Sequence, residues 1–564
     1  MKTASLKEGH ARPFFPLGEH ALLRLGALLA GLAVLLPLLA LVALSLSGGG
    51  ADWVHLARNV LPVAIRTTAF VMAGVALLTV SMGIVPAWLT AYYEFPGRRI
   101  LAWALVLPLA VPTYLAAYAY GEFFTFTGPA QTLLRALFGF RSARDYWFPD
   151  VRSLWGAVMV LSFVLYPYVY LTTRAAFLMQ GRNATDVART LGASPARAFF
   201  QVLLPMARPA IIIGVTLALM ETLNDVGAVE FLGVKTLTST VYTTWLNQGS
   251  LSGAAQIACI MLIVVLCVIL AERWARRKQR FHLGRSTSMA QRTSAIRLGG
   301  IHAALACVAC LMPIIAGFVL PFYVLGSYAL DRLDQLLDPV LQEAILTSVL
   351  VAAAAALVTV GLAFLLTYAV RLTRSRHMLL LNRFAALGYA IPGTVLALGI
   401  LIPLARFDNL LDQWMQGAFG IRTGLLLTGS ALCIVYAMSV RFLAMAEGSV
   451  EAGFHKVPTH IDMAARTLGR NARETLFQVL LPILKPAVLT AGLLVFIDGI
   501  KELSATILLR PFNYNSLSTY VYERASRAAV EDASVAALLI MLAGIVPVIV
   551  LTRTINAGVA RTQS

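Results

Sequence analysis

Charged residues are scarce in this chain of 564 amino acids. Asp, Glu, Lys and Arg make up 13% of it and hydrophobic residues 59%, whereas an ordinary soluble domain has about 25% charged residues. The composition therefore excludes a soluble globular domain and predicts a membrane protein. Acidic residues are the scarcer kind, with 27 Asp and Glu against 45 Lys and Arg and a net charge of +18. The basic residues are dispersed between apolar runs, so membrane topology and anionic lipid explain the excess better than a nucleic acid does.

Sequence motifs of an enzyme are also missing. No Gly-x-x-x-x-Gly-Lys-Ser/Thr stretch occurs, so the chain has no P-loop with which to bind ATP. No catalytic constellation occurs either, and we expect neither enzymatic activity nor a cofactor. The five cysteines all lie inside apolar runs, which excludes a disulfide framework. Cys307 and Cys310 have metal-ligand spacing, but without a second pair we interpret them as helix-packing residues.

Long runs without charge are abundant. Ten of them reach bilayer-spanning length, namely residues 25–47, 67–93, 100–121, 154–173, 251–271, 298–330, 344–370, 384–405, 423–440 and 533–552. Two shorter runs, 209–220 and 486–497, end at Glu221 and Asp498 and resume as apolar sequence afterwards, so we predict two interrupted spans. The predicted fold is an all-α polytopic membrane protein with about twelve transmembrane helices. Prolines inside two of the runs, Pro112 and Pro392, are expected to kink their helices.

The chain also contains an internal repeat. Ala-Arg-Thr-Leu-Gly at 188–192 and Phe-Gln-Val-Leu-Leu-Pro at 200–205 return 277 residues later, at 465–469 and 477–482. Of the 23 positions aligned from 188–210 and 465–487, 13 are identical, while the flanking spans share little beyond apolar character. The repeat predicts a first unit at 1–272, a linker at 273–297 and a second unit at 298–564. Six spans in each unit make the two parallel rather than inverted.

The distribution of Lys and Arg predicts the orientation. Four of these residues lie in the first 24 positions and eight lie between 273 and 297. Because cytoplasmic loops retain positive charge, we expect both termini, the linker and both repeated cassettes on the cytoplasmic side of the membrane. The loop at 121–153 is then external although it holds four arginines, and it is long enough to form a small folded element. The first apolar run is interpreted as a span and not as a cleavable signal.

Each repeated cassette has the composition of two short helices joined at a turn, since its glycine permits the turn and its proline begins the next element. At these residues the chain resembles ABC-importer permeases, whose signature is Glu-Ala-Ala, three residues, Gly and then a Leu-Pro pair. In that family the cassette is a coupling helix that docks on a cytoplasmic ATPase subunit. Asp186-Val187-Ala188 and Met463-Ala464-Ala465 stand in place of Glu-Ala-Ala, with Asp462 as a substitute for the acid in the second copy. The resemblance implies coupling roles, within cassettes near 182–208 and 459–485, for Asp186, Ala188, Arg189, Gly192, Pro205, Ala465, Arg466, Gly469 and Pro482.

A narrower resemblance lies in residues 221–228, 237–245 and 501–510. These segments are similar to the fused ferric-iron permeases, which are served by a periplasmic iron-binding protein. The resemblance implies a permease of the bacterial inner membrane that works with two copies of an ATPase subunit and with that binding protein. Related branches carry spermidine or putrescine, thiamine, 2-aminoethylphosphonate, sulfate or molybdate. Spermidine or putrescine, thiamine and 2-aminoethylphosphonate remain alternatives, whereas the acids described next argue against sulfate and molybdate.

Four carboxylates are the candidate residues of the translocation pathway. Glu221 aligns with Asp498 and Asp225 with Glu502 at the offset of 277, and each pair has the i,i+4 spacing that puts two residues on one helix face. An acid at the bilayer centre costs about 2.5–3.5 kcal/mol by insertion scales, which argues for water or a cation nearby. The alternative is a structural pairing or a place at headgroup level, with Lys501 as an available partner. Four converging acids favour a hard cation or polyamine over an oxyanion, held transiently; no resident metal site is assigned.

A secondary transporter is the rival class, because it too can consist of two parallel six-span halves. Its signature loops would follow the second span of each half. Here those loops, 94–99 and 371–383, share no motif. The repeated sequence lies instead between the fourth and fifth spans, which favours the ATP-driven importer.

Overall fold

A computed structural model describes residues 21–47, 50–180, 188, 190–276, 296–373, 375–458, 460–471 and 474–561. These residues are almost entirely helical, and their one sheet contact is a short parallel pairing of β1 (Tyr93–Glu94) with β2 (Ile296–Arg297). Helices satisfy every backbone hydrogen bond internally, which lipid requires. Most of the predicted basic linker, 277–295, lies outside the described residues.

Eleven helices in the described residues are long and apolar enough to cross a membrane, and a bent pair makes twelve if it is counted as one span. The eleven are α1 (Ala21–Leu46), α3 (Leu61–Tyr92), α7 (Leu154–Gln180), α10 (Leu204–Asn224), α13 (Leu251–Arg276), α14 (Gly300–Ile314) with α15 (Leu320–Leu330), α16 (Pro339–Thr373), α18 (Gly393–Phe419), α19 (Leu432–His455), α22 (Leu481–Lys501) and α25 (Val530–Arg561). The predicted all-α fold with about twelve spans is therefore confirmed.

The run at 100–121 is not a straight helix. It divides into α4 (Arg98–Ala104) with η2 (Leu107–Ala110) and then α5 (Thr113–Phe124), which continues into α6 (Pro129–Phe138). The two parts meet at an angle of 95°. Pro112 between them has φ −56° and ψ 141°, and Pro392 before α18 has φ −58° and ψ 141°. Both prolines therefore break the helix, which is a stronger effect than the kinks predicted for them.

The prediction of two interrupted spans is wrong. The apolar run at 209–220 lies in a continuous helical segment, Phe199–Asn224, and its counterpart lies in Thr475–Lys501. Each span gains its length from the cassette on its N-terminal side. The apolar sequence beyond the acids forms short separate helices, α11 (Gly227–Phe231) and α12 (Leu237–Leu246) in the first repeat and α23 (Thr506–Leu509) and α24 (Leu517–Ser526) in the second.

In the described part of the chain four π-helical turns interrupt the longer helices, and a proline follows each of them. They are η1 (Leu56–Val60), η3 (Phe199–Leu203), η4 (Ile315–Val319) and η7 (Thr475–Leu480), and the prolines are Pro62, Pro205, Pro321 and Pro482. Proline cannot donate to the carbonyl four residues earlier and its ring crowds that carbonyl. Widening the preceding turn relieves this crowding. The cassette prolines therefore begin α10 and α22 without interrupting the helical segments Phe199–Asn224 and Thr475–Lys501.

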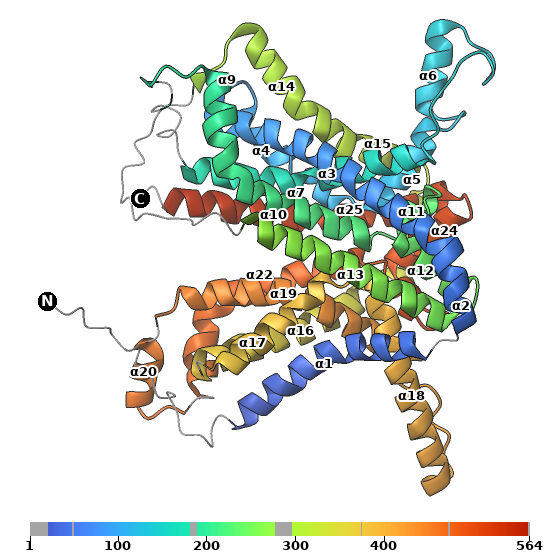
Figure 1. Ribbon diagram of the computed structural model, residues 1–564, viewed down its shortest axis with the longest axis vertical. Coiled ribbons are helices and arrows are strands. Elements are labelled where there is room, and N and C mark those ends of the chain that lie inside the picture. Colours follow the sequence, from blue (N-terminus) through green and yellow to red (C-terminus); the bar gives the residue numbers. More distant parts are fainter. Residues whose placement is uncertain are drawn as a thin grey trace, which may run out of the picture.

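The two repeats exchange their first helices. Figure 1 shows two groups of helices, with α1 lying along the group formed by the second repeat. There α1 packs on α16, α17 (Arg376–Ala385) and α18 and keeps a contact with α13 of its own repeat, while α14 packs on α3 and α4 of the first repeat. The approach is close, because a Cβ added to Gly31 would lie 2.2 Å from Leu381 and one added to Gly399 would lie 2.2 Å from the Pro37 carbonyl. Each half of the molecule thus contains residues of both repeats.

The duplication extends beyond the cassettes into the hydrogen bonding. Thr236 caps α12 and Ser516 caps α24, each with a capping box. The next backbone N–H in each case donates to a distant hydroxyl, Leu237 to Thr68 across 2.9 Å and Leu517 to Ser348 across 2.7 Å. The second set lies 280 residues after the first. These tethers fix α12 and α24 to equivalent places in the two repeats.

Candidate functional site

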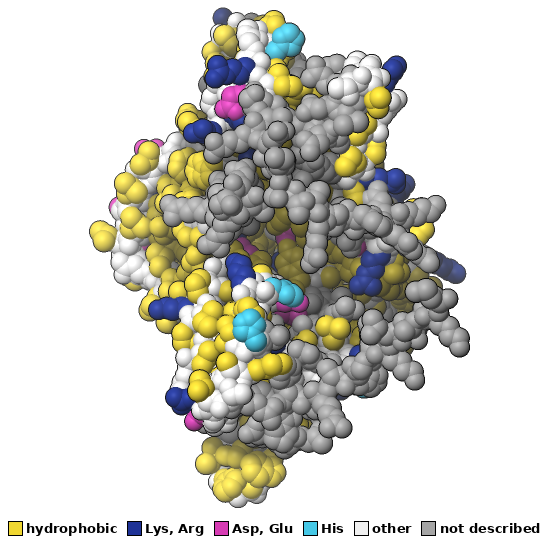
Figure 2. Space-filling model, turned by 90° about the vertical axis from the view of Figure 1, so that its left-hand side faces the viewer, with side chains coloured by type: hydrophobic (Ala, Val, Ile, Leu, Met, Phe, Trp, Pro, Cys, Tyr) yellow, Lys and Arg dark blue, Asp and Glu magenta, His cyan; other side chains and the backbone are white. Residues whose placement is uncertain are grey.

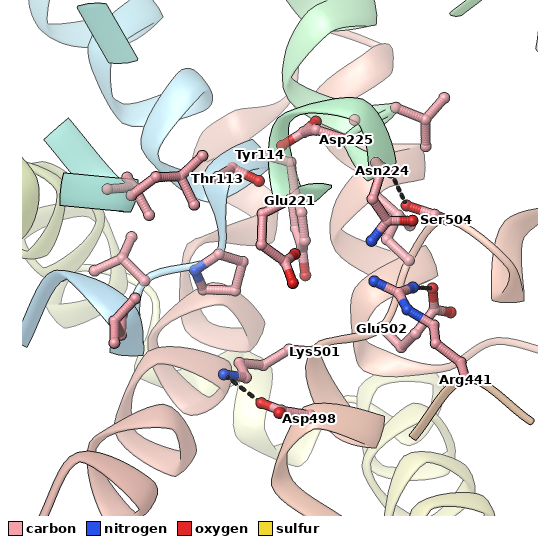
Figure 3. Close-up of a pocket in the computed structure, with 18 of the residues that line it drawn as sticks. Thr113, Tyr114, Glu221, Asn224, Asp225, Arg441, Asp498, Lys501, Glu502 and Ser504 are labelled. Carbon is pink, nitrogen blue, oxygen red and sulfur yellow. Dashed lines mark hydrogen bonds and ion pairs between the residues drawn. The ribbon is translucent and has the colours of Figure 1, made fainter. Parts of the chain in front are cut away.

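A cavity of about 240 Å³ lies between the two halves and is lined by both. All four predicted pathway acids line it, together with Arg441 and Lys501 (Figure 3). The acids come from the ends of α10 and α22. Val111, Pro112 and the start of α5 form another part of the wall, as does Tyr389 in η6 (Ala386–Ala390), ahead of Pro392. The break before α5 therefore places loop residues at the cavity.

The acids of each pair do not share a helix face as predicted. Helix α10 ends at Asn224 and α22 ends at Lys501. Asp225 and Glu502 follow these ends with extended backbones, at ψ 117° and 120°. The chain turns between the two acids of each pair, which relieves the like-charge repulsion that an i,i+4 pair would have.

Asp225 and Glu502 have structural partners. Asp225 accepts the Ala228 N–H at 2.7 Å, and Glu502 accepts the backbone N–H groups of Ala505 and Thr506, both at 3.0 Å. Each carboxylate thus caps the short helix that follows it. Glu502 also pairs with Arg441 at 2.5 Å, and both of these side chains are buried.

Glu221 and Asp498 face different partners. The Tyr389 hydroxyl donates to Glu221 across 2.8 Å, and Lys501 lies 2.8 Å from Asp498. The ion pair between Asp498 and Lys501 is the structural pairing that was the alternative to a role in the pathway. Four carboxylates against two cations leave the cavity with a formal excess of two negative charges. The four acids thus converge on one cavity as predicted, but at least Glu502 and Asp498 are paired with cations of the same chain.

Asn224 is a site residue that the sequence analysis missed. Its side-chain oxygen accepts the Gly393 N–H at 2.7 Å, and its carbonyl accepts the Ser504 hydroxyl at 2.8 Å. Both bonds join one repeat to the other. The sequence could have indicated Asn224 as a site residue, because the offset of 277 that aligns the acids also aligns Asn224 with Lys501.

A further bond between the repeats joins α12 to α24. The Tyr522 hydroxyl donates to the Tyr242 hydroxyl across 3.3 Å. Figure 1 shows α12 and α24 at the end of the molecule opposite the cassette helices α9 (Pro195–Ala198) and α20 (His460–Thr467). The halves are therefore joined at the cavity and at the end away from the cassettes.

Both cassettes contain the predicted turn at glycine. Gly192 has φ +86° and Gly469 has φ +82°, a left-handed conformation that other residues rarely adopt. The Ala193 N–H donates to the Ala188 carbonyl at 3.0 Å, and the Arg470 N–H donates to the Ala465 carbonyl at 3.1 Å. Among the described residues, no atom lies within 4 Å of a Cβ added to either glycine. The glycines are required by the backbone and not by packing within the chain.

The residue before each of these glycines was also missed. Leu191 and Leu468 are 82% and 81% exposed, although both are large and apolar. Phe200 and Phe477, also equivalent, are 64% and 56% exposed. Their exact repetition in both cassettes was the available signal. The two copies present the same apolar side chains outward, and they do so at the same end of the molecule (Figure 1).

The remaining coupling candidates divide into three groups. Asp186 and Arg189 lie outside the described residues, as does the side chain of Arg466. Ala188 is half-buried and Ala465 is buried, so the latter faces its own chain. Asp462, the substitute for the family acid, accepts the Arg371 Nε–H at 3.1 Å and is also buried. It attaches α20 to the end of α16 and does not point outward.

No group of three or more His, Cys, Asp or Glu residues in the described part of the chain could hold a metal ion. Cys307 donates to the Pro96 carbonyl, and Cys310 is buried among apolar residues. This is consistent with helix packing for the two cysteines.

A family model matches most of the first repeat, and known proteins resemble the chain over nearly its whole length or over less than half of it. The family described as "Binding-protein-dependent transport system inner membrane component" matches residues 79–281, which include the first cassette and α10. The chain is 25% identical to the Fe(3+)-transport system permease protein FbpB 2 of Haemophilus influenzae, over 93% of this chain and 97% of that protein. It is 30% identical to the molybdenum transport system permease protein ModB of Escherichia coli, over 37% of this chain and 90% of that protein. A probable sulfate transport system permease protein of Nephroselmis olivacea is 29% identical, over 45% of this chain and 88% of that protein.

Proposed function

Because this chain belongs to the family of binding-protein-dependent transport system inner membrane components, we propose that it forms the complete membrane pathway of an ATP-driven importer for ferric iron. The chain is an ABC-importer permease, and this family membership removes the secondary transporter as an alternative. Two ATPase subunits bind the cassettes at 188–205 and 465–482. A periplasmic binding protein delivers the substrate to the opposite end.

One observation carries the assignment of iron. The similarity to the Fe(3+) permease covers 93% of this chain, so it includes both repeats and the cavity between them. The excess of carboxylates in that cavity supports a hard cation, for which oxygen ligands are preferred. Glu221 is the acid best suited to meet the ion, since its partner is the neutral Tyr389 hydroxyl and not a cation.

An oxyanion is the second candidate substrate. The relatives named for molybdenum and sulfate favour it, as do Arg441 and Lys501 in the cavity wall. An oxyanion would have to displace Glu502 from Arg441 or Asp498 from Lys501 before either cation could bind it. Glu502 also caps a helix, so this displacement costs more than the approach of a cation to Glu221.

The bonds between the repeats supply a mechanism for alternating access. In the present conformation, Asn224 and the Tyr242–Tyr522 pair hold the halves together away from the cassettes. We propose that ATP binding draws the two cassettes together on the cytoplasmic side. The halves then pivot, these bonds break, and the cavity opens to the binding protein.

Uptake into proteoliposomes tests the substrate. The permease is reconstituted with its ATPase and binding protein, and ATP-dependent uptake of ferric iron, molybdate, sulfate and spermidine is compared in one preparation. The proposal predicts uptake of iron and none of the oxyanions. Uptake of molybdate or sulfate without iron would move the substrate to the oxyanion branch, and uptake of spermidine alone would move it to the polyamine branch.

A further inference from the structure

Two equivalent arms extend from the helix bundle. The first consists of α6 and the segment 139–153, and the second of the C-terminal half of α18, residues 404–419, and the segment 420–431; we name them the outer arms. Helix α6 ends at Gly139 with φ +72° and α18 ends at Gly420 with φ +71°. Each of these glycines donates its N–H to the carbonyl four residues earlier. In Figure 1 the arms point in opposite directions, away from the bundle, nearer the end that carries α12 than the cassettes.

The second arm has two exposed faces of opposite character. Phe407, Leu410 and Trp414 recur at i, i+3 and i+7 and are 51%, 66% and 60% exposed. They form one apolar stripe. Asn409 and Gln413, which are also exposed, lie on a neighbouring polar face, roughly a third of a turn from the stripe at 3.6 residues per turn.

A third face of this helix is covered by its own chain. The Thr428 N–H donates to Asp408 at 2.8 Å, and the Gly424 N–H donates to Asp412 at 2.8 Å. The return segment is thereby fixed against the helix, and it leaves the apolar stripe uncovered. The stripe is consequently a permanent outer surface of the protein and needs an apolar partner.

The first arm repeats this character. Leu133, Leu137 and Phe138 are 61%, 71% and 67% exposed, and Trp147 on the return segment is 85% exposed. Arg135 stacks 4.1 Å over the Phe126 ring, and Arg141 and Arg144 are exposed nearby. Apolar side chains mixed with tryptophan and arginine are typical of the membrane interface.

The direction of the outer arms also indicates the membrane interface. Helices α5 and α6 together make an angle of 95° with α4 and η2, so this arm runs across the direction of the spans. Figure 2 views the molecule from the cassette end, and its lowest part, which Figure 1 identifies as the arm of α18, presents hydrophobic side chains to the viewer. Hydrophobic side chains of this arm therefore face back toward the level of the spans.

We propose that the outer arms are interfacial helices, which lie in the headgroup region of the leaflet on the α12 side with their apolar stripes on the acyl chains. The partner is thus the lipid surface. Helix α18 begins at Gly393, which donates to Asn224 in the cavity, and α5 begins at the equivalent Thr113. Each arm therefore fixes, relative to the membrane, a helix that starts at the pathway.

Cysteine accessibility in the full-length protein tests this proposal. Leu410→Cys and Trp414→Cys are made on the apolar stripe, with Asn409→Cys and Gln413→Cys as matched controls on the polar face of the same helix. Each variant is placed in lipid nanodiscs without its ATPase or binding protein and treated with a membrane-impermeant maleimide, and the labelling of the five native cysteines is subtracted. Because the thiolate is the reactive form and lipid disfavours it, the stripe positions should react at least about tenfold more slowly than the controls.

A lipid-specific measurement distinguishes burial of the stripe in lipid from other causes of slow labelling. A fluorophore attached to the same cysteines should be quenched by brominated phospholipid at Leu410→Cys and much less at Asn409→Cys. Leu137→Cys and Thr132→Cys make the same comparison on the first arm. Equal reactivity of stripe and control, or slow reaction without lipid quenching, overturns the proposal. Protection of the stripe that develops only when the periplasmic binding protein is added also overturns it and identifies the arms as that protein's docking surface.

Discussion

The hydroxyls of Tyr242 and Tyr522 lie 3.3 Å apart and occupy equivalent positions of the two repeats, 280 residues from each other. Their hydrogen bond therefore joins equivalent residues of the two repeats, which are related by pseudo-twofold symmetry. Such a contact must break if the halves separate at this end, so it contributes directly to the closed conformation.

Removing this contact should favour the outward-open conformation. A hydrogen bond between neutral groups contributes about 1 kcal/mol, so the double variant Tyr242→Phe with Tyr522→Phe should raise basal ATPase activity of the assembled transporter by up to about fivefold. Tyr323→Phe, an exposed tyrosine 60% accessible in α15, is the control. An unchanged basal activity in the double variant would show that these hydroxyls do not hold the halves together.

The cassette glycines should tolerate no β-branched residue. Gly192→Val and Gly469→Val force a left-handed backbone that costs about 1–2 kcal/mol for an L-residue, and the turn will relax away from its present shape. Transport should fall and ATPase association should weaken while the amount of permease in the membrane stays normal. Gly326→Ala is the control, because Gly326 has no positive φ and an added Cβ would meet no described atom. Normal transport by both valine variants would refute the coupling role of the turns.

Leu191 and Leu468 should be contact residues for the ATPase. Each is more than four-fifths exposed, so Leu→Asp at either position should leave the fold intact and reduce co-purification of the ATPase. An apolar side chain buried at an interface contributes about 1.5–3 kcal/mol, and the double variant should lose most of the complex. Leu337→Asp, where the leucine is 79% exposed away from the cassettes, should have no such effect. Full ATPase binding by the double variant would place the docking surface elsewhere.

The four cavity acids should separate into two classes. Glu221→Gln should assemble normally and reduce iron uptake, because Tyr389 can still donate to the amide oxygen. Glu502→Gln should instead lower thermal stability, since it leaves the buried Arg441 without its partner, and breaking a buried pair costs about 3–5 kcal/mol. Melting temperature and uptake are measured on the same preparations. Equal losses of uptake at unchanged stability for both variants would assign Glu221 and Glu502 to one role.

Much of this architecture could be predicted from the sequence because lipid imposes simple rules. Uncharged runs marked the spans, and the exact repetition at 188–205 located both cassettes with their left-handed glycines. The ends of α10 and α22 could not be predicted, since Glu221 and Asp225 have helical spacing and only the tertiary structure shows that the chain turns after Asn224. The pairing of Arg441 with Glu502 joins residues 61 positions apart, and no local pattern reveals it. The right-angle break before α5 was signalled by Pro112, but its size depends on packing.

The exchange of the first helices was also beyond sequence reasoning. Nothing in the apolar run at 25–47 distinguishes a helix that packs on its own repeat from one that packs on the other. Gly31 and Gly399 permit the close contacts with Leu381 and Pro37. However, a glycine in an apolar helix does not indicate which other helix packs against it. Such pairings depend on shape complementarity between distant surfaces.

One chain is expected to supply the whole membrane pathway and both ATPase docking surfaces. The mass of the intact transporter, determined on the purified complex in nanodiscs or by native mass spectrometry, tests this stoichiometry. We expect one permease chain with two ATPase subunits, and a complex with two permease chains would refute the proposal.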